Sequence, residues 1–223
     1  MNLADCRGDW ALVTGATSGI GREFCVQLAA AGLNVAMVAR RKQSMDDLAS
    51  ELRARHGVRT LVVDQDLAVP GAAAAVRERV ARHDVVARLL VNSAAFGPWG
   101  RFENFPAEHY ERLIQLVAVT PVSMCRVFHE DIRSFARSAI VNVSSPAALQ
   151  PVPFMAAYAS AKSCLHDFSL ALHAEWKASG VLVQTLVPGP TRSESCAASA
   201  PAGRCALRNA VNWSSEAWGR TDR

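Results

Sequence analysis

Short apolar runs alternate along this chain with longer segments of helical period. The runs at 10–13 and 139–143 are apolar at nearly every position, which is typical of strands buried on both faces of a sheet. Further strands are predicted at 34–38, 60–63, 88–91 and 181–187. Because buried strands that alternate with helices form a parallel sheet covered on both sides, the pattern predicts an α/β fold with a doubly wound parallel sheet.

Five helices are predicted between these strands, at 20–31, 44–56, 70–83, 106–130 and 157–179. Ser44 and Asp47 form a capping-like pair that marks the start of the second helix. The fourth helix is long, and we expect it to bend near Pro121, because proline lacks the backbone N–H that a helix interior uses.

The composition points to one globular domain. The chain has 223 residues, half of them hydrophobic, so it can bury a sizeable core. The net charge is +4, and basic residues lie next to acidic ones, as at positions 77–79. We therefore expect a solvated surface and no nucleic acid partner.

The six cysteines fall at no metal-ligand spacing, and no metal site is predicted. Cys25, Cys125 and Cys164 lie in helix-like apolar patterns, where a free cysteine packs as a small hydrophobic side chain. The first ten residues contain no apolar run. We expect no signal peptide, no membrane span and a cytoplasmic location.

A glycine-rich turn at 14–21 joins the first predicted strand to the first helix. Gly15 suits a tight turn, Gly19 a close approach of the backbone to a pyrophosphate, and Gly21 close packing of helix on strand. A purely structural turn uses the same residues, but a strand before it and a helix after it favour a dinucleotide site. The predicted binding residues here are Gly15, Thr17, Ser18, Gly19, Ile20 and Gly21.

The end of the second strand bears on which dinucleotide binds. Arg40 and Arg41 stand there, and no acidic residue is present to hold a ribose 2′-hydroxyl. Arginine accommodates a 2′-phosphate, so NADP(H) is preferred over NAD(H); the alternative is that both arginines only face water. After the third strand, Asp66 either caps a turn or accepts a hydrogen bond from the adenine amino group.

Three further polar residues are predicted to meet at the carboxyl edge of the sheet. Tyr158 and Lys162 are four residues apart and therefore share one face of a helix. Ser145 follows the fifth strand directly. A lone Tyr-x-x-x-Lys is common by chance, but behind a cofactor turn the three groups predict a catalytic site.

In this order and spacing the motifs resemble the short-chain dehydrogenase/reductase family, over residues 10 to about 192. They are the glycine-rich turn, Asp66-Leu67, 141–145, Tyr158-x-x-x-Lys162 and 188–191. The glycine spacing resembles the short, single-domain branch, and the segments 149–154 and 180–184 resemble the 3-oxoacyl-CoA and 17β-hydroxysteroid reductases more weakly. The resemblance implies a Rossmann-type dinucleotide-binding fold.

The resemblance also implies roles for individual residues. Tyr158 would be the general acid/base, and Lys162 would favour its phenolate and bind the nicotinamide ribose. Ser145 would hydrogen-bond the substrate oxygen. Asn92 would lie beside the cofactor, and the residues expected along its carboxamide and pyrophosphate are Pro188, Gly189 and Thr191.

Two positions depart from the family pattern. Ala95 replaces the last glycine of the family's Asn-Asn-Ala-Gly segment, which is tolerable only if its φ stays negative. Val117 stands where the family has a fourth catalytic residue, an asparagine whose main-chain carbonyl helps to hold a water in the proton relay. Valine keeps a carbonyl, so we expect reduced rather than abolished activity.

The C-terminal part also departs from the pattern. Residues 1–192 are predicted to form the dinucleotide-binding and catalytic domain. Residues 193–203 are rich in Ala and Ser, and 204–223 show neither strand alternation nor a helical face. We expect 193–223 to be an atypical tail in which the family's final strand is missing or replaced.

These motifs predict an NADP(H)-dependent oxidoreductase that interconverts a small-molecule ketone and a secondary alcohol. The aromatic segment 96–100 and the subgroup resemblance favour a lipophilic substrate, such as a 3-oxoacyl or steroid-like ketone. The alternative is an NADP(H)-binding sensor or partner protein with little turnover, which Val117 and the tail favour. A homo-oligomer is also consistent with the family resemblance.

Overall fold

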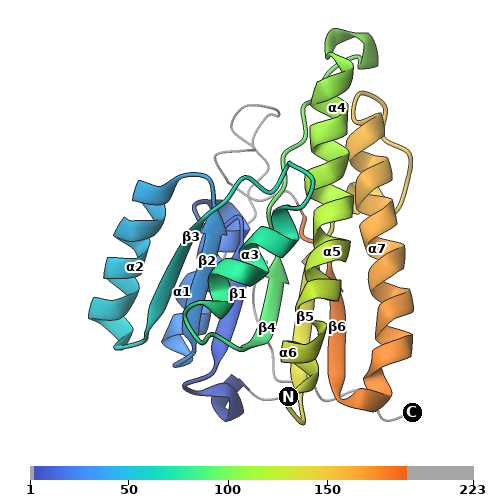
Figure 1. The fold of residues 1–223 in the computed structure, drawn as a ribbon. Helices are drawn as coiled ribbons and strands as arrows, with labels where there is room; N and C mark the ends of the chain where they lie inside the picture. Colours follow the sequence, from blue (N-terminus) through green and yellow to red (C-terminus); the bar gives the residue numbers. More distant parts are fainter. Residues whose placement is uncertain (1–2, 190–223) are drawn as a thin grey trace.

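The structure, a computed structural model, describes residues 3–189 and contains the predicted alternation of strands and helices (Figure 1). The strands are β1 (Trp10–Thr14), β2 (Asn34–Ala39), β3 (Thr60–Asp64), β4 (Ala87–Asn92), β5 (Ser138–Val143) and β6 (Val181–Leu186). The helices are α1 (Gly19–Ala30), α2 (Lys42–His56), α3 (Ala72–Ala81), α4 (Ala107–Ile114), α5 (Thr120–Val127), α6 (His129–Arg133) and α7 (Ala156–Trp176).

All six strands pair in parallel, in the order β3-β2-β1-β4-β5-β6. The chain winds outward from β1 through β2 to β3, and then crosses back to β4 on the other side of β1. Open parallel sheets bind ligands where the winding reverses, outside the carboxyl ends of the strands. The sheet therefore confirms the predicted doubly wound fold and points to the carboxyl ends of β1 and β4.

The core lies in two layers, one on each face of the sheet. Side chains alternate along a strand, so Ala11 and Val13 of β1 face the layer under α1 and α2, while Leu12 faces the layer under α3, α5 and α7. Figure 1 shows α3, α5 and α7 together in front of the sheet.

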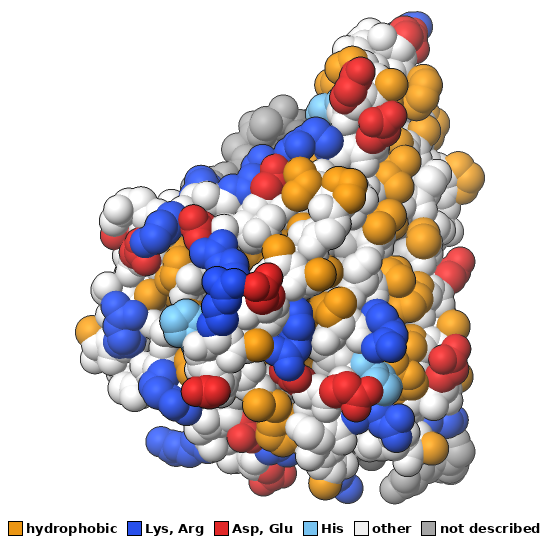
Figure 2. Space-filling view, in the orientation of Figure 1, with side chains coloured by type: hydrophobic (Ala, Val, Ile, Leu, Met, Phe, Trp, Pro, Cys, Tyr) orange, Lys and Arg blue, Asp and Glu red, His pale blue; other side chains and the backbone are white. Residues whose placement is uncertain are grey.

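On the face shown in Figure 2, basic side chains lie among acidic ones.

The start of the second helix was predicted wrongly. The helix begins at Lys42, two residues before the predicted Ser44, and Arg41 occupies the N-cap position without a side-chain cap bond. The prediction relied on a capping pair, but Ser44 lies inside the first turn. The end of β2 leads almost directly into the helix, and this connection sets where the helix starts.

The predicted helix at 106–130 is divided into α4, a π-helical turn (Gln115–Val119) and α5, and α6 then follows as a short separate helix. The distortion lies before Pro121 rather than at it. In the π turn the Thr120 N–H bonds the Gln115 carbonyl five residues back. Pro121 follows in the first turn of α5, where a missing N–H is tolerated.

Cys164 was also predicted wrongly, because its side chain is exposed, whereas Cys25 and Cys125 are buried as expected. The buried side of α7 carries residues spaced by three or four, such as Ala161 and Leu165, and Cys164 points away from them.

No helix among residues 3–189 is long and apolar enough to cross a membrane. Thr191 and the predicted tail at 193–223 lie outside the described residues.

Candidate active site

The glycine-rich turn closes over the end of β1. Gly15 has a φ of +70°, and a Cβ on it would lie 2.8 Å from the Cα of Ala94, in the segment after β4. A Cβ on Gly21 would lie 2.3 Å from the carbonyl oxygen of Gly15. Side chains at these positions would collide with the protein backbone, so the glycines let the turn pack closely against the segment after β4 and let α1 begin directly behind the turn.

Thr14 connects this turn to β4 and the segment after it. Its hydroxyl accepts hydrogen bonds from the backbone N–H groups of Ser93 (3.0 Å) and Ala94 (3.2 Å), and donates to the Val91 carbonyl (3.4 Å). The carboxyl ends of β1 and β4 are therefore held together at the point where the winding reverses. The sequence reasoning assigned no role to Thr14, since its partners lie almost eighty residues away.

Two arginines follow β2 beside this turn. The Arg41 guanidinium donates to the Thr17 hydroxyl at 3.1 Å, so its charge lies against the glycine-rich turn. Arg40 is exposed, and its charge helps to lower the pKa of Asp66. Positive charge is thus present at the end of β2, where a ribose 2′-substituent would lie.

Asp66 takes the turn-capping role that was one of its two alternatives. One carboxylate oxygen accepts the Ala68 N–H at 2.9 Å, and the other accepts the Arg112 guanidinium at 2.8 Å. Burial alone would raise the pKa of Asp66, but these two donors outweigh it and hold the pKa below its ordinary value. A carboxylate has further lone pairs, so the adenine role is compatible with this geometry.

Lys162 lies almost fully buried in the second turn of α7, with 2% of its surface exposed. Its Nζ donates to the Val143 carbonyl at 2.6 Å and lies 5.7 Å from the centre of the Tyr158 ring. Burial lowers the pKa of Lys162 to about 8. The amine is therefore still mostly protonated at neutral pH, and its charge lies close to the tyrosine.

Hydrogen bonds fix α7 to the segment that follows β5. The Ser144 hydroxyl donates to the Lys162 carbonyl at 3.2 Å, and the Ser163 hydroxyl donates to the Ala148 carbonyl at 2.7 Å. Ser145 lies within this segment, and its hydroxyl accepts the Ala147 N–H at 3.2 Å. Ser145 and Lys162 thus belong to two elements that are bound directly to each other.

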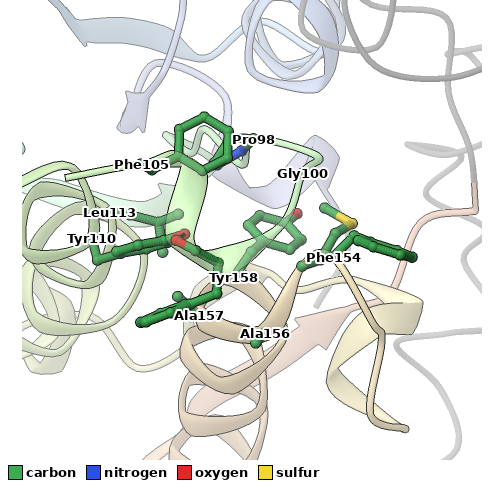
Figure 3. Close-up of a pocket in the computed structure, with 11 residues that line it drawn as sticks. Pro98, Gly100, Phe105, Tyr110, Leu113, Phe154, Ala156, Ala157 and Tyr158 are labelled. Carbon is green, nitrogen blue, oxygen red and sulfur yellow. Dashed lines mark hydrogen bonds between the residues drawn. The ribbon is translucent and has the colours of Figure 1, made fainter. Parts of the chain in front are cut away.

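A small pocket, with a cavity volume of about 40 Å³, opens beside Tyr158 at the N-terminal end of α7 (Figure 3). Aromatic rings dominate its wall, namely Phe102, Phe105, Tyr110 and Phe154. Phe102 stacks on Tyr110, whose hydroxyl donates to the Phe102 carbonyl at 2.7 Å. Ser145 and Lys162 are not among the lining residues, so Tyr158 is the one member of the predicted catalytic set that lines this pocket.

Asn92 lies at the end of β4, but its side chain points into the protein. Its amide donates to the Asn142 side chain at 2.8 Å, and the Asn142 amide donates in turn to the Ser169 hydroxyl at 2.9 Å. All three residues are buried. This chain links β4 and β5 to α7, which gives the Asn92 side chain a structural role. The sequence reasoning missed Asn142 and Ser169.

A family model described as short chain dehydrogenase matches residues 9–202. The chain belongs to the short-chain dehydrogenase family. A 7β-hydroxysteroid dehydrogenase from Collinsella aerofaciens is 34% identical over 206 residues, which cover 91% of this chain and 76% of that protein. A very-long-chain 3-oxoacyl-CoA reductase from Anas platyrhynchos is 30% identical over 187 residues, covering 81% of this chain and 59% of the relative's length.

Among solved structures, a short-chain dehydrogenase from Sphingobium yanoikuyae in complex with NADPH superposes with a TM-score of 0.84. The two proteins are 30% identical in sequence, and the match covers 91% of this chain and 80% of the Sphingobium protein. The family resemblance and the Rossmann-type fold expected from the sequence are therefore confirmed.

The two departures from the family pattern are accommodated by the backbone. Ala95 is not among the described non-glycine residues with positive φ, so the methyl group that replaces the family's glycine causes no backbone strain. Val117 is fully buried within the π-helical turn, so the helix distortion persists without the asparagine. Pro121, four residues on, has no N–H to offer the Val117 carbonyl, which therefore lacks the donor that an α-helix supplies.

Proposed function

We propose that this short-chain dehydrogenase uses NADP(H) to interconvert a lipophilic ketone and its secondary alcohol. One observation carries the proposal: Tyr158 lines an aromatic pocket at the carboxyl edge of the sheet, with the buried amine of Lys162 beside its ring. A phenol next to a buried cation can exchange a proton near neutral pH, which an isolated tyrosine does poorly.

Each residue then has a defined task. Tyr158 donates its phenolic proton to the substrate oxygen during reduction and takes it back during oxidation. The Lys162 ammonium favours the phenolate that remains. The Ser145 hydroxyl donates a hydrogen bond to the substrate oxygen, where negative charge develops. When bound, NADPH supplies the hydride, and the chain's part is to place the carbonyl and move the proton.

The residues around the glycine-rich turn fit NADP(H). Gly15 and Gly21 allow the close backbone packing that sets the turn at the N-terminus of α1, and Arg40 and Arg41 provide positive charge with no carboxylate at the end of β2. Asp66 would accept from adenine, and the other predicted contacts are Thr17, Ser18, Gly19, Ile20, Asn92, Tyr158, Lys162, Pro188, Gly189 and Thr191. The NADPH-bound relative from Sphingobium supports the same choice.

The exposed aromatic rings of the pocket support an apolar substrate. Phe102 and Phe154 are 63% and 50% exposed, so their rings offer apolar surface that a bound ligand would cover. A hydroxysteroid dehydrogenase and a very-long-chain 3-oxoacyl-CoA reductase are among the relatives, and a steroid and a very long acyl chain are both hydrophobic. Steroid-like and 3-oxoacyl ketones are therefore the first substrates to test.

The test is NADPH oxidation against a panel of steroid, 3-oxoacyl and small polar ketones. Tyr158→Phe removes only the phenolic oxygen, and we expect it to reduce kcat by about 10²-fold or more. Unchanged activity in this variant would refute the mechanism. Tight NADPH binding with no turnover of any ketone would instead favour the alternative, a sensor or partner protein.

The cofactor preference has its own test. Replacing both Arg40 and Arg41 by Ala should raise the Kd for NADPH roughly tenfold or more while leaving that for NADH nearly unchanged, because each charged hydrogen bond contributes about 1.5–3 kcal/mol. Arg55→Ala is the matched control, since Arg55 lies at the far end of α2 and pairs with Glu51. Tighter binding of NADH than of NADPH by the wild-type protein would overturn the assignment.

Two further predictions concern the oligomeric state and the cellular location of the protein. A homo-oligomer stays a prediction, supported by the exposed side chains of Ile114, Val119 and Leu170, and light scattering would test it. The cytoplasmic location also stays a prediction.

A further inference from the structure

The segment after β4 touches the Tyr158 ring through Gly97. A Cβ built on Gly97 would lie 2.5 Å from Cδ2 and 2.9 Å from Cγ of Tyr158, closer than the 3.0 Å that real Cβ atoms keep. The approach runs along one edge of the ring, from Cγ through Cδ2 to Cε2, which would lie at 3.0 Å. A side chain at this position could be accommodated only if the Tyr158 ring or the segment that carries Gly97 moved.

The Tyr158 ring is packed on one side against buried side chains, and it also lines the pocket. Tyr158 packs against a small cluster of buried residues from α4, the π-helical turn and α7, which includes Leu113, Val117 and Ala161. Close-packed interiors of this kind do not absorb an added methyl group without shifting their side chains. The cluster and the backbone of Gly97 thus form two walls of a slot around the Tyr158 ring, and the pocket lies on a further side.

The segment that carries Gly97 is held at both ends. Before it, the Ser93 and Ala94 N–H groups bond the Thr14 hydroxyl. After it, the Gly100 N–H donates to the Phe154 carbonyl at 3.0 Å, which ties the segment to the entrance of α7. Figure 3 shows Pro98 and Gly100, which follow this position in the chain, above the Tyr158 ring.

We propose that Gly97 is a positioning residue, whose missing side chain forms one wall of the slot that sets the position of the Tyr158 ring. The inference rests on the proposed function, in which Tyr158 donates the proton. A proton donor must lie within about 2.6–3.2 Å of its acceptor. A misplacement of about 1 Å can cost on the order of 10²-fold in rate.

Gly97→Ala tests the missing side chain alone. Gly97 is not among the glycines with positive φ, so alanine can adopt the same backbone conformation. We expect kcat to fall on the order of 10²-fold, with the KM for NADPH changed less than about twofold, because the ring moves and the cofactor turn does not.

Gly100→Ala is the matched control, because it adds the same methyl group to the same segment. Its Cβ would meet the Phe105 ring at 2.9 and 3.2 Å and would not reach Tyr158. We expect this variant to raise the KM for the ketone through the pocket wall rather than to lower kcat. Retention of kcat in Gly97→Ala within about twofold, or equal losses of kcat in both variants, would overturn the proposal.

A second readout does not depend on turnover. The chain has only two tyrosines, Tyr110 and Tyr158, so NMR of protein labelled with ¹³C-tyrosine gives two ring signals, and Tyr158→Phe assigns them. Gly97→Ala should shift the Tyr158 signal and leave that of Tyr110 in place; an unmoved Tyr158 signal contradicts the proposal. Absence of turnover in the wild-type protein would contradict the proposed function, whereas a shifted Tyr158 signal would still support the contact.

Discussion

Replacing Lys162 with methionine should change how the stability of the protein depends on pH. Burial lowers the pKa of Lys162 to about 8, compared with 10.5 for a lysine in water. The amine is almost fully buried, and its one hydrogen bond goes to the neutral Val143 carbonyl. Folding therefore disfavours the charged form, and the protonated side chain costs stability.

The sign and size of the effect follow from the two pKa values. Below about pH 8 both states bind the proton, and the cost of burying the charge is fully present. Between pH 8 and 10.5 only the unfolded chain stays protonated, so the wild-type protein gains stability as the pH rises. Each pKa unit is worth about 1.4 kcal/mol, which gives a total gain of about 3 kcal/mol.

The assay is urea unfolding of cofactor-free protein at several pH values, from about pH 7 to about pH 11. The difference in unfolding free energy between wild type and Lys162→Met should rise by about 3 kcal/mol across this range. Making both proteins in a Tyr158→Phe background removes the coupled titration of the phenol. Lys177→Met is the control, because Lys177 is exposed and its amine stays in water in both states.

A difference that stays flat with pH would refute the reasoning, since water must then reach the Lys162 amine. A difference that falls with pH would refute it more strongly, because the folded protein would then favour the charged amine.

Three further substitutions test the helix distortion and the buried hydrogen bonds around the site. Val117→Asn should raise kcat by restoring the family residue, and should lower the unfolding free energy by about 1–2 kcal/mol because it buries an amide; unchanged turnover would contradict the expectation of reduced activity. Pro121→Ala returns an N–H that can bond the Val117 carbonyl, and we expect kcat to fall roughly tenfold in steady-state assays. Asn142→Leu removes the oxygen acceptor of the buried Asn92 amide, while the Ser169 hydroxyl keeps its bond to the Leu165 carbonyl, so chemical denaturation should show a loss of about 1–3 kcal/mol; a neutral result would mean that the Asn92–Asn142 bond contributes little.

The sequence predicted the features that depend on short-range spacing. The six strands lie within a residue or two of their predicted bounds, because a strand buried on both faces leaves a continuous apolar run. Tyr158 and Lys162 share a helix face because residues four positions apart lie one turn above the other. These properties are set by neighbours along the chain, so one sequence is enough to recognise them.

Contacts between distant segments were beyond this reasoning. The bond from Lys162 to the Val143 carbonyl and the contact of Gly97 with Tyr158 join parts of the chain that meet only through the sheet order. The orientation of the Asn92 side chain depends on the strand pleat, which decides whether a residue at the sheet edge faces the ligand or the core. A motif match names the residue but not the direction in which its side chain points.

The position of Val117 illustrates a different limit of matching residue by residue. The family asparagine is missing there, and by residue type alone the site loses a functional group. Yet the feature expected to serve the relay is the main-chain carbonyl of residue 117. In an α-helix this carbonyl would accept a hydrogen bond from the N–H of the residue four positions later. Pro121 cannot donate to it, and the adjacent π-helical turn persists. If the relay uses this carbonyl, activity should therefore depend more on Pro121 than on the side chain at 117.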